Sequence, residues 1–323
     1  MIASFDRQCG IGAQLSPSEA PIWLDGATLL TNAQDRGDTA LVRLSPGGQA
    51  VWVGRAPRVV ASHSARAGVG HAVFVASTPT MPSELFVVDL ATGAARQLTQ
   101  FNATWRSGRD VSEPQHLVVT VTPGVELDAW FMPPANRVEG QQYPVLLNVH
   151  GGPFTQYGRG FFDEFHAYTG AGYGVVFCNP RGSAGQSTAF ARSIIGHLGE
   201  DDYRDVMACF DAALLQMPWA DRSRLGVMGG SYGGFMASWI IGHDQRFAAA
   251  ISERAVNDWY TMQGTSDIGA TFNELYLGPD AVIEGDLQAV LRQSPLTYAR
   301  DMRTPDRKST RLNSSHGYIS YAV

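Results

Sequence analysis

The sequence predicts an α/β protein with a parallel sheet and flanking helices, preceded by a separate region of β structure. Three observations predict this fold class. Short apolar runs alternate with turn residues through roughly the first third of the chain. Continuous apolar runs alternate with helical patterns in the remainder. A glycine-flanked serine, Ser231, stands between an apolar strand and an apolar helix.

Composition limits the possible functions. The chain has 323 residues, of which 44% are hydrophobic and 17% charged, and this is enough for two globular domains. The net charge of −6 and the lack of a basic cluster argue against a nucleic-acid partner. The three cysteines lie far apart and match no disulfide or zinc pattern. We therefore predict no metal and no organic cofactor.

Two further observations concern location. No apolar run reaches transmembrane length, so no membrane partner is predicted. The first residues lack the basic-then-apolar order of a signal peptide. The sequence therefore predicts a cytoplasmic protein, and it leaves the oligomeric state open.

Residues 1–122 are predicted to form a partial β-propeller. A strand–turn–strand unit at 41–53 recurs at 85–98, an offset of 44 residues, which is the length of one four-stranded blade. We assign 115–121 to this region as a further strand. A β-sandwich is the alternative. About 120 residues hold only two to three blades, and a closed propeller needs about four or more. We therefore expect blades to be missing on the N-terminal side.

Residues 123–305 are predicted to form the α/β domain, with the crossing between domains at 123–143, where Pro133-Pro134 is typical of a linker. The pattern predicts four buried strands, at 144–149, 174–179, 225–228 and 247–251. It also predicts one long helix at 201–217, with acidic residues in its first turn. The acidic residues at 200–205 could suggest a metal site. We interpret them as a helix start that complements the helix dipole.

Ser231 is the candidate nucleophile. Gly229-x-Ser231-x-Gly233 follows the nucleophile-elbow pattern of α/β-hydrolases, in which a sharp strand-to-helix turn lifts the serine hydroxyl above the sheet. Side chains at positions 229 and 233 would collide with the adjoining strand and helix, so glycine is needed at both. Ser183 also lies among glycines but fails the pattern, and we interpret it as a loop residue.

The run His150-Gly151-Gly152-Pro153 directly follows the first strand of the α/β domain. Such a loop supplies one oxyanion donor in α/β-hydrolases, and the residue after the nucleophile supplies the other. The predicted donors are the N–H of Gly151 or Gly152 and the N–H of Tyr232. His150 is not predicted to be the base, because in these enzymes the histidine follows the serine in the chain.

Three motifs together resemble the prolyl oligopeptidase family of serine peptidases, with the acylaminoacyl-peptidase and dipeptidyl-peptidase branch most similar. The motifs are His150–Phe154, Asn179–Ser183 and Gly229–Gly234. The resemblance implies an N-terminal propeller that screens substrates by size and a hydrolase domain that cleaves short peptides. It also implies Ser231 as nucleophile, and Trp259 and Phe272 in an apolar substrate pocket.

The chain departs from the family after Thr304-Pro305, where the family has a core strand followed by the catalytic aspartate and, later, the histidine. The run after Thr304-Pro305 contains no apolar strand, and we interpret residues 306–323 as a non-native tail that is left out of the predicted fold. Asp306 and His316 are separated by nine residues, which leaves no room for the helix that normally intervenes. The Asp and His of the triad are therefore predicted to be absent, and the chain to be truncated at both ends.

Two other functions stay open. An esterase could use the same elbow and oxyanion loop, although a lone esterase domain would not need the β region. A propeller-based binding module with an inert hydrolase domain is the non-enzymatic alternative.

Overall fold

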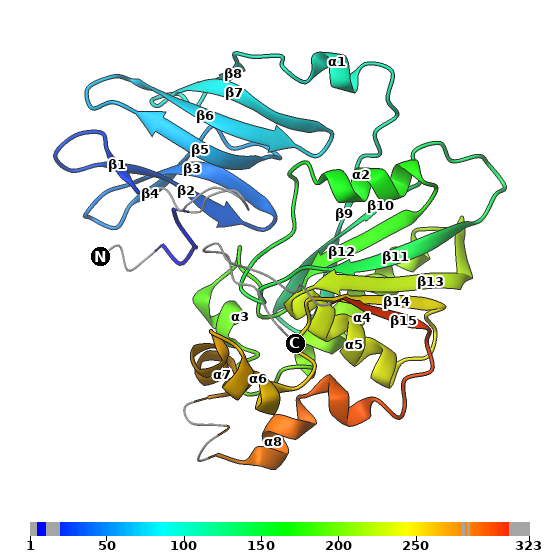
Figure 1. The fold of residues 1–323 in the computed structure, drawn as a ribbon. Helices are drawn as coiled ribbons and strands as arrows, with labels where there is room; N and C mark the ends of the chain where they lie inside the picture. Colours follow the sequence, from blue (N-terminus) through cyan, green and yellow to red (C-terminus); the bar gives the residue numbers. More distant parts are fainter. Residues whose placement is uncertain (1–4, 11–19, 279–281, 283–284, 310–323) are drawn as a thin grey trace. The chain divides into compact units, whose positions relative to one another are not determined.

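The computed structural model describes residues 5–10, 20–278, 282 and 285–309 (Figure 1). These residues form two compact units. The first contains the described residues up to Pro114, together with Gln156–Gly170 and Ala184–Thr188. The second contains Gln115–Thr155, Ala171–Ser183 and the described residues from Ala189 onward. Within the described residues, no helix has the length and apolar character needed to cross a membrane.

The first unit is built from two four-stranded antiparallel meanders. Their strands are β1 (Ile22–Trp23), β2 (Leu29–Asp35), β3 (Asp38–Leu44) and β4 (Ala50–Val53), then β5 (Val59–Ala65), β6 (His71–Thr78), β7 (Met81–Asp89) and β8 (Ala95–Gln97). One parallel pair, Thr39 with Val59, joins the meanders into a single eight-stranded sheet. The repeat found in the sequence corresponds to β3–β4 and β7–β8, the third and fourth strands of each meander. Two short helices, α1 (Ala103–Arg106) and α2 (Asp163–Gly170), also belong to this unit.

The second unit is organised on a seven-stranded mixed sheet in the order β15-β14-β13-β11-β12-β10-β9. The strands are β9 (Gln115–Thr122), β10 (Val125–Met132), β11 (Tyr143–Val149), β12 (Gly174–Asn179), β13 (Ala220–Gly230), β14 (Ala249–Glu253) and β15 (Asp306–Ser309). The pairs β9–β10 and β10–β12 are antiparallel, and the others are parallel. All four strands predicted for the α/β domain are confirmed.

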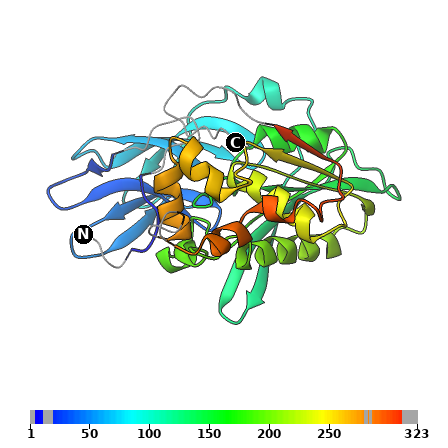
Figure 2. The same ribbon diagram turned by 60° about the horizontal axis from the view of Figure 1, so that its bottom comes forward.

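The helices of the second unit follow its strands. They are α3 (Thr188–Arg192), which starts at the junction of the units, α4 (Asp201–Leu215), α5 (Tyr232–His243), α6 (Trp259–Thr265), α7 (Gly269–Leu277), α8 (Leu287–Arg292) and the 3-10 helix η1 (Pro295–Tyr298). The predicted helices at 201–217 and after Ser231 are α4 and α5. Both bury aromatic side chains, Phe210 and Phe235, in the core of this unit. Helices α6, α7 and α8 lie together, gold to orange in Figure 2.

The predicted domain boundary at residues 122 and 123 is wrong by eight residues. Strand β9 pairs with β10 in the second sheet and is not a strand of the first unit. The stretch 123–143 is not a simple crossing, because β10 lies within it and pairs with β12, placing Trp130 opposite Phe177. Pro133-Pro134 ends this buried strand. The prolines suggested a linker, and the apolar run before them was the stronger signal.

Two segments of the predicted α/β domain, Gln156–Gly170 and Ala184–Thr188, belong to the first unit. The Gln156 side chain accepts a hydrogen bond from the N–H of Gly37 at 3.0 Å and donates one to the carbonyl of Asp38 at 2.9 Å. Arg159 forms an ion pair with the Asp38 carboxylate. These partners are more than 100 residues away in sequence, so no local pattern could indicate them.

A short strand without apolar residues follows Thr304-Pro305, within the segment that the predicted fold leaves out. Strand β15 pairs in parallel with β14, placing Asp306 opposite Ala250. A strand ladder is made by backbone groups, so an edge strand can form without an apolar run. The rest of the predicted tail, including His316, lies outside the described residues.

Candidate active site

Ser231 lies between the end of β13 and the start of α5. Its backbone has φ 61° and ψ −122°, a conformation that costs energy for any residue with a side chain. The surroundings hold it there. The Ser231 N–H donates to the carbonyl of Glu253 at 2.9 Å, and its carbonyl accepts from the N–H of Phe235 at 3.0 Å. The strand–turn–helix context predicted for the elbow is therefore present, and the strain is located at the serine itself.

The glycines flanking Ser231 are required by close backbone contacts. A Cβ atom at Gly233 would lie 2.0 Å from the carbonyl oxygen of Val149. A Cβ at Gly229 would lie 2.6 Å from that oxygen and from the carbonyl carbon of Gly233. Backbone atoms of a central strand cannot move aside, so these distances confirm the steric reason for both glycines.

Two of the predicted oxyanion donors, Gly151 and Tyr232, adjoin Ser231. A Cβ at Gly151 would lie 3.4 Å from the Ser231 Cβ and 3.9 Å from its Oγ, so Gly151 is a direct neighbour of the serine. Tyr232 is the first residue of α5, and its N–H therefore has no acceptor within the helix. Gly152 has a different role in the loop. Its φ of 122° favours glycine, and this conformation lets the chain turn closely toward Phe154. The catalytic role of these groups stays a prediction.

The side chain of His150 is buried inside the loop that carries Gly151. Its Nδ1 lies 2.7 Å from the Gly151 carbonyl, which can only accept, so Nδ1 carries the proton. Its Nε2 lies 3.0 Å from the Oγ of Ser183 and therefore accepts from that hydroxyl. This ring is therefore hydrogen-bonded to Ser183, and it stays a prediction that His150 is not the catalytic base.

Ser183 lies in a loop, as predicted, and its side chain also has a structural role. Its side chain is buried and supplies the hydroxyl that holds His150. The motif Asn179–Ser183 after a buried strand was the available signal, but it did not indicate which side chain the serine would meet.

Burial lowers the pKa of His150 from 6.5 to about 4, although the bond to the Gly151 carbonyl acts in the opposite direction. Between these two pH values the unfolded chain binds the proton and the folded chain does not. His150 therefore contributes stability above pH 6.5 that is lost as the pH falls toward 4. Asp202 changes the stability with pH in the opposite direction. Burial raises its pKa from 3.8 to about 6, so the stability that it contributes at low pH is lost as the pH rises.

We expect the free energy of unfolding of the wild type, relative to His150→Asn, to fall by about 3 kcal/mol between pH 7 and pH 4. Comparing the two proteins cancels the contribution of Asp202, which both contain. Urea unfolding at several pH values measures the difference. A difference that does not change with pH would show that His150 is not held neutral by burial.

The side chain of Tyr232 is anchored below the elbow. Its hydroxyl donates to the Asp202 Oδ2 at 2.6 Å, and both side chains are buried. Asp202 also accepts from the N–H of Tyr203 at 2.9 Å. Burial, with the nearby Asp202 as the next cause, raises the pKa of Tyr232 well above its usual value. The bond joins the first turn of α4 to the residue that follows the candidate nucleophile, and no local pattern in the sequence indicates this contact.

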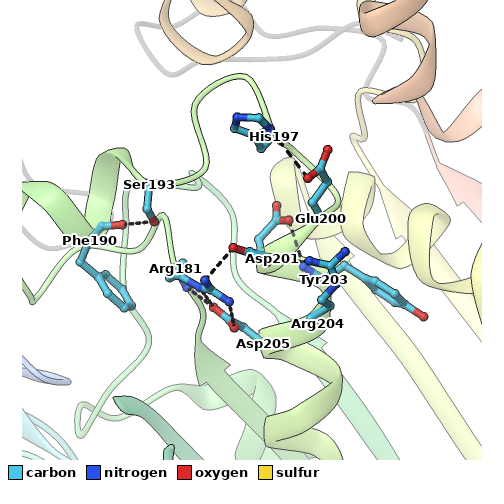
Figure 3. A network of polar contacts seen from close by, with 10 residues as sticks. Arg181, Phe190, Ser193, His197, Glu200, Asp201, Tyr203, Arg204 and Asp205 are labelled. Carbon is cyan, nitrogen blue, oxygen red and sulfur yellow. Dashed lines mark hydrogen bonds and ion pairs between the residues drawn. The ribbon is translucent and has the colours of Figure 1, made fainter. Parts of the chain in front are cut away.

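The acidic residues at the start of α4 have specific partners (Figure 3). Arg181 donates to both oxygens of Asp205 at 2.7 and 2.8 Å and to Asp201 at 2.6 Å. The Asp205 side chain is completely buried, so this bidentate pair is part of the core. The helix-start interpretation suits Asp201 and Asp202, which lie in the first turn, whereas Asp205 serves as the acceptor for Arg181.

The predicted pocket residues Trp259 and Phe272 stack on each other, with ring centroids 5.6 Å apart. Trp259 is only 1% exposed and packs against Phe235, and its Nε1 donates to the carbonyl of Gln293. It therefore has no open surface to offer a substrate, and its assignment to the pocket wall is corrected: the ring supports Phe272 from the core. Phe272 is partly buried, and its contact with substrate stays a prediction.

No histidine within the described part of the chain forms a hydrogen bond with the hydroxyl of Ser231. His316 lies outside the described residues, and nothing is described of the Asp306 side chain. The site therefore contains the candidate nucleophile, Ser231, and its neighbouring amides. Its fold and turn are those of an α/β-hydrolase elbow.

Comparisons with known proteins agree with this class. The sequence pattern of the prolyl oligopeptidase family (peptidase S9) matches residues 159–317. The uncharacterized peptidase YuxL of Bacillus subtilis is 35% identical over 288 residues, covering 89% of this chain and 43% of YuxL. The Pyrococcus horikoshii acylaminoacyl peptidase superposes with a TM-score of 0.84 at 29% identity, covering 95% of this chain and 46% of that one. An acylaminoacyl peptidase in complex with Z-Gly-Gly-Phe-chloromethyl ketone gives 0.83 at 28%, with the same coverage.

The chain belongs to the prolyl oligopeptidase family of peptidases. It spans less than half the length of each of these three relatives.

Proposed function

We propose that this protein is a serine-type peptidase that hydrolyses short peptides through Ser231. The observation that carries the proposal is the strained backbone of Ser231 beside Gly151 and at the start of α5. The family membership and the peptidase relatives support it. Ser231 Oγ attacks the scissile carbonyl, and the N–H groups of Gly151 and Tyr232 stabilise the negative charge that develops on the carbonyl oxygen.

The attack also needs a histidine to take the hydroxyl proton and a carboxylate to orient that histidine. No such pair contacts Ser231 among the described residues. We therefore propose that the present chain is acylated only slowly: the Ser231 hydroxyl proton passes to water, the bond from Oγ to the carbonyl carbon forms, and the bond to the leaving group breaks, with stabilisation from the oxyanion donors. The triad Asp and His are not predicted in this sequence.

We also propose that the two four-stranded meanders are blades of a β-propeller. Their repeat of 44 residues and their four-stranded plan support this. A propeller would restrict entry to short peptides, in keeping with the family resemblance. The cytoplasmic location also stays a proposal.

The substrate class is proposed from the same branch of the family. An acylaminoacyl peptidase relative was solved with a peptide inhibitor that ends in phenylalanine. Phe272 is a suitable wall for such an apolar side chain. An esterase and an inert propeller-based binding module are the alternatives.

The test measures covalent acylation. We expect an N-acyl-phenylalanine p-nitrophenyl ester to add one acyl group to the tryptic peptide that contains Ser231, as detected by mass spectrometry. The activated leaving group makes acylation observable without a general acid. Ser231→Ala should remove the adduct. Ser193→Ala, at an exposed serine on another loop, should retain it.

An adduct that persists in Ser231→Ala would overturn the assignment of the nucleophile. In the full-length protein, comparing an N-acyl-peptide anilide with a short acyl ester separates the enzyme alternatives, because an esterase would accept only the ester. No adduct from any substrate would favour the binding module.

A further inference from the structure

Arg254 occupies a position beside the candidate nucleophile that the proposed mechanism does not use. It directly follows β14, whose last residue, Glu253, pairs in parallel register with Gly230 of β13. Arg254 therefore follows β14 at the position that matches Ser231 after β13. The hydrogen bond from the Ser231 N–H to the Glu253 carbonyl links the two strands at this level.

The guanidinium of Arg254 fills the space left by the missing side chain of Gly230. A Cβ at Gly230 would lie 2.5 Å from the Arg254 Nη2, 3.4 Å from its Cζ and 3.5 Å from its Nε. Three atoms of the planar group are thus close to the residue that precedes Ser231. Position 230 is unrestricted in the elbow pattern, and the absence of a side chain there leaves room for the guanidinium.

The backbone of Arg254 is also strained, with a φ of 51°. Such a conformation is uncommon for a residue with a side chain and is held only by its surroundings. It sets the direction in which the side chain leaves the end of β14. Strained backbone residues cluster at active sites and ligand clamps, so the strain at Arg254 indicates a functional role for its side chain.

The charge of Arg254 is only weakly compensated. Among the described residues, its ion-pair partner is Glu253, with Nη2 and Oε2 3.3 Å apart and both side chains 40% exposed. A pair with this exposure contributes little and is easily exchanged. A guanidinium has five N–H donors in a fixed fork, which suits a carboxylate. The positive end of α5, which begins at Tyr232, adds to the attraction for an anion.

We propose that Arg254 is a specificity-determining residue that binds a carboxylate of the peptide next to the scissile bond. The inference rests on the proposed function and names the chemistry of the preferred substrate. The carboxylate can be the C-terminus of a very short peptide or an acidic side chain. Glu253 occupies the guanidinium in the free protein and is displaced when the substrate binds.

The test is peptide binding to this chain by isothermal titration calorimetry, which does not require turnover. The probes are acetyl-Gly-Phe-Ala with a free C-terminus, the same peptide as its amide, and acetyl-Gly-Phe-Asp-amide. We expect the free acid to bind about tenfold or more tightly than the amide, as for a charge-assisted bidentate contact. A comparable gain for the aspartyl peptide would identify the acidic side chain as a second source of the carboxylate.

The variants separate specificity from folding. Arg254→Gln should reduce the ratio of the two dissociation constants to near one while leaving amide binding and the thermal midpoint unchanged. Arg254→Lys should restore part of the preference, since it keeps the charge without the fork. Glu253→Gln should increase the preference, because it removes the competing carboxylate.

Equal binding of the three peptides would overturn the role of Arg254 and leave the peptidase proposal intact. A preference that survives in Arg254→Gln would also overturn it. If no peptide binds, Arg254 has no such role, and the acylation of Ser231 decides separately whether the peptidase proposal stands.

Discussion

Gly233→Ala is expected to destabilise the second unit by about 3 kcal/mol or more, at the upper end of the cost of inserting a methyl group into a packed core. The new Cβ would lie 2.0 Å from the Val149 carbonyl oxygen and 2.9 Å from that of His150. Both neighbours are backbone atoms at the end of a central strand, so neither can move without disturbing the sheet. Urea unfolding followed by tryptophan fluorescence measures the effect.

Gly264→Ala is the matched control. Gly264 lies in α6 of the same unit, and a Cβ there would meet no heavy atom within 4 Å. Alanine favours a helix over glycine by up to about 1 kcal/mol, so this variant should be neutral or slightly more stable. Equal losses from the two substitutions would mean that the contact between Gly233 and Val149 does not explain the requirement for glycine.

Arg181→Met is expected to cost about 3–5 kcal/mol, because it leaves the carboxylate of Asp205 buried without its partner. The side chain of Asp205 has no exposed surface, and Arg181 is its bidentate donor (Figure 3). The backbone N–H of Arg181 also donates to Asp205 at 2.9 Å, and that bond remains in the variant. The same urea unfolding measures the loss.

Arg204→Met is the control for this pair. Arg204 also binds an aspartate of α4, Asp201, but the two side chains are 69% and 44% exposed. A surface pair of this kind contributes about 0.5 kcal/mol or less. The double variant Arg181→Met/Asp205→Asn should recover part of the loss, because the buried charge is removed. If it recovers nothing, the loss comes from packing of the arginine and not from its charge.

The sequence predicted the α/β unit well because its signals are local. A buried parallel strand is a short apolar run, and the four predicted runs became β11, β12, β13 and β14. The elbow could be found for the same reason, since the requirement for Gly229 and Gly233 is set by spacing around one turn. The repeat of 44 residues located two meanders, although it does not establish a closed propeller.

The errors arose where a signal was ambiguous or absent. Strand β9 has the same pattern as the strands before it, so its sheet could not be assigned from the sequence. Pro133-Pro134 suggested a linker, although the buried strand β10 lies directly before it. Strand β15 has no apolar run to indicate it in the sequence. It can form because backbone hydrogen bonds to β14 are sufficient for pairing.

By itself, the sequence determined the order of the strands and helices around Ser231, and which positions must be glycine. Both depend on residues within a few positions of one another. Only the tertiary structure decided which side chains meet: His150 with Ser183, Tyr232 with Asp202, Arg254 with the space over Gly230. The members of each pair are 24 or more residues apart. The close approach of such residues is set by the packing of whole strands and helices, which no local spacing encodes.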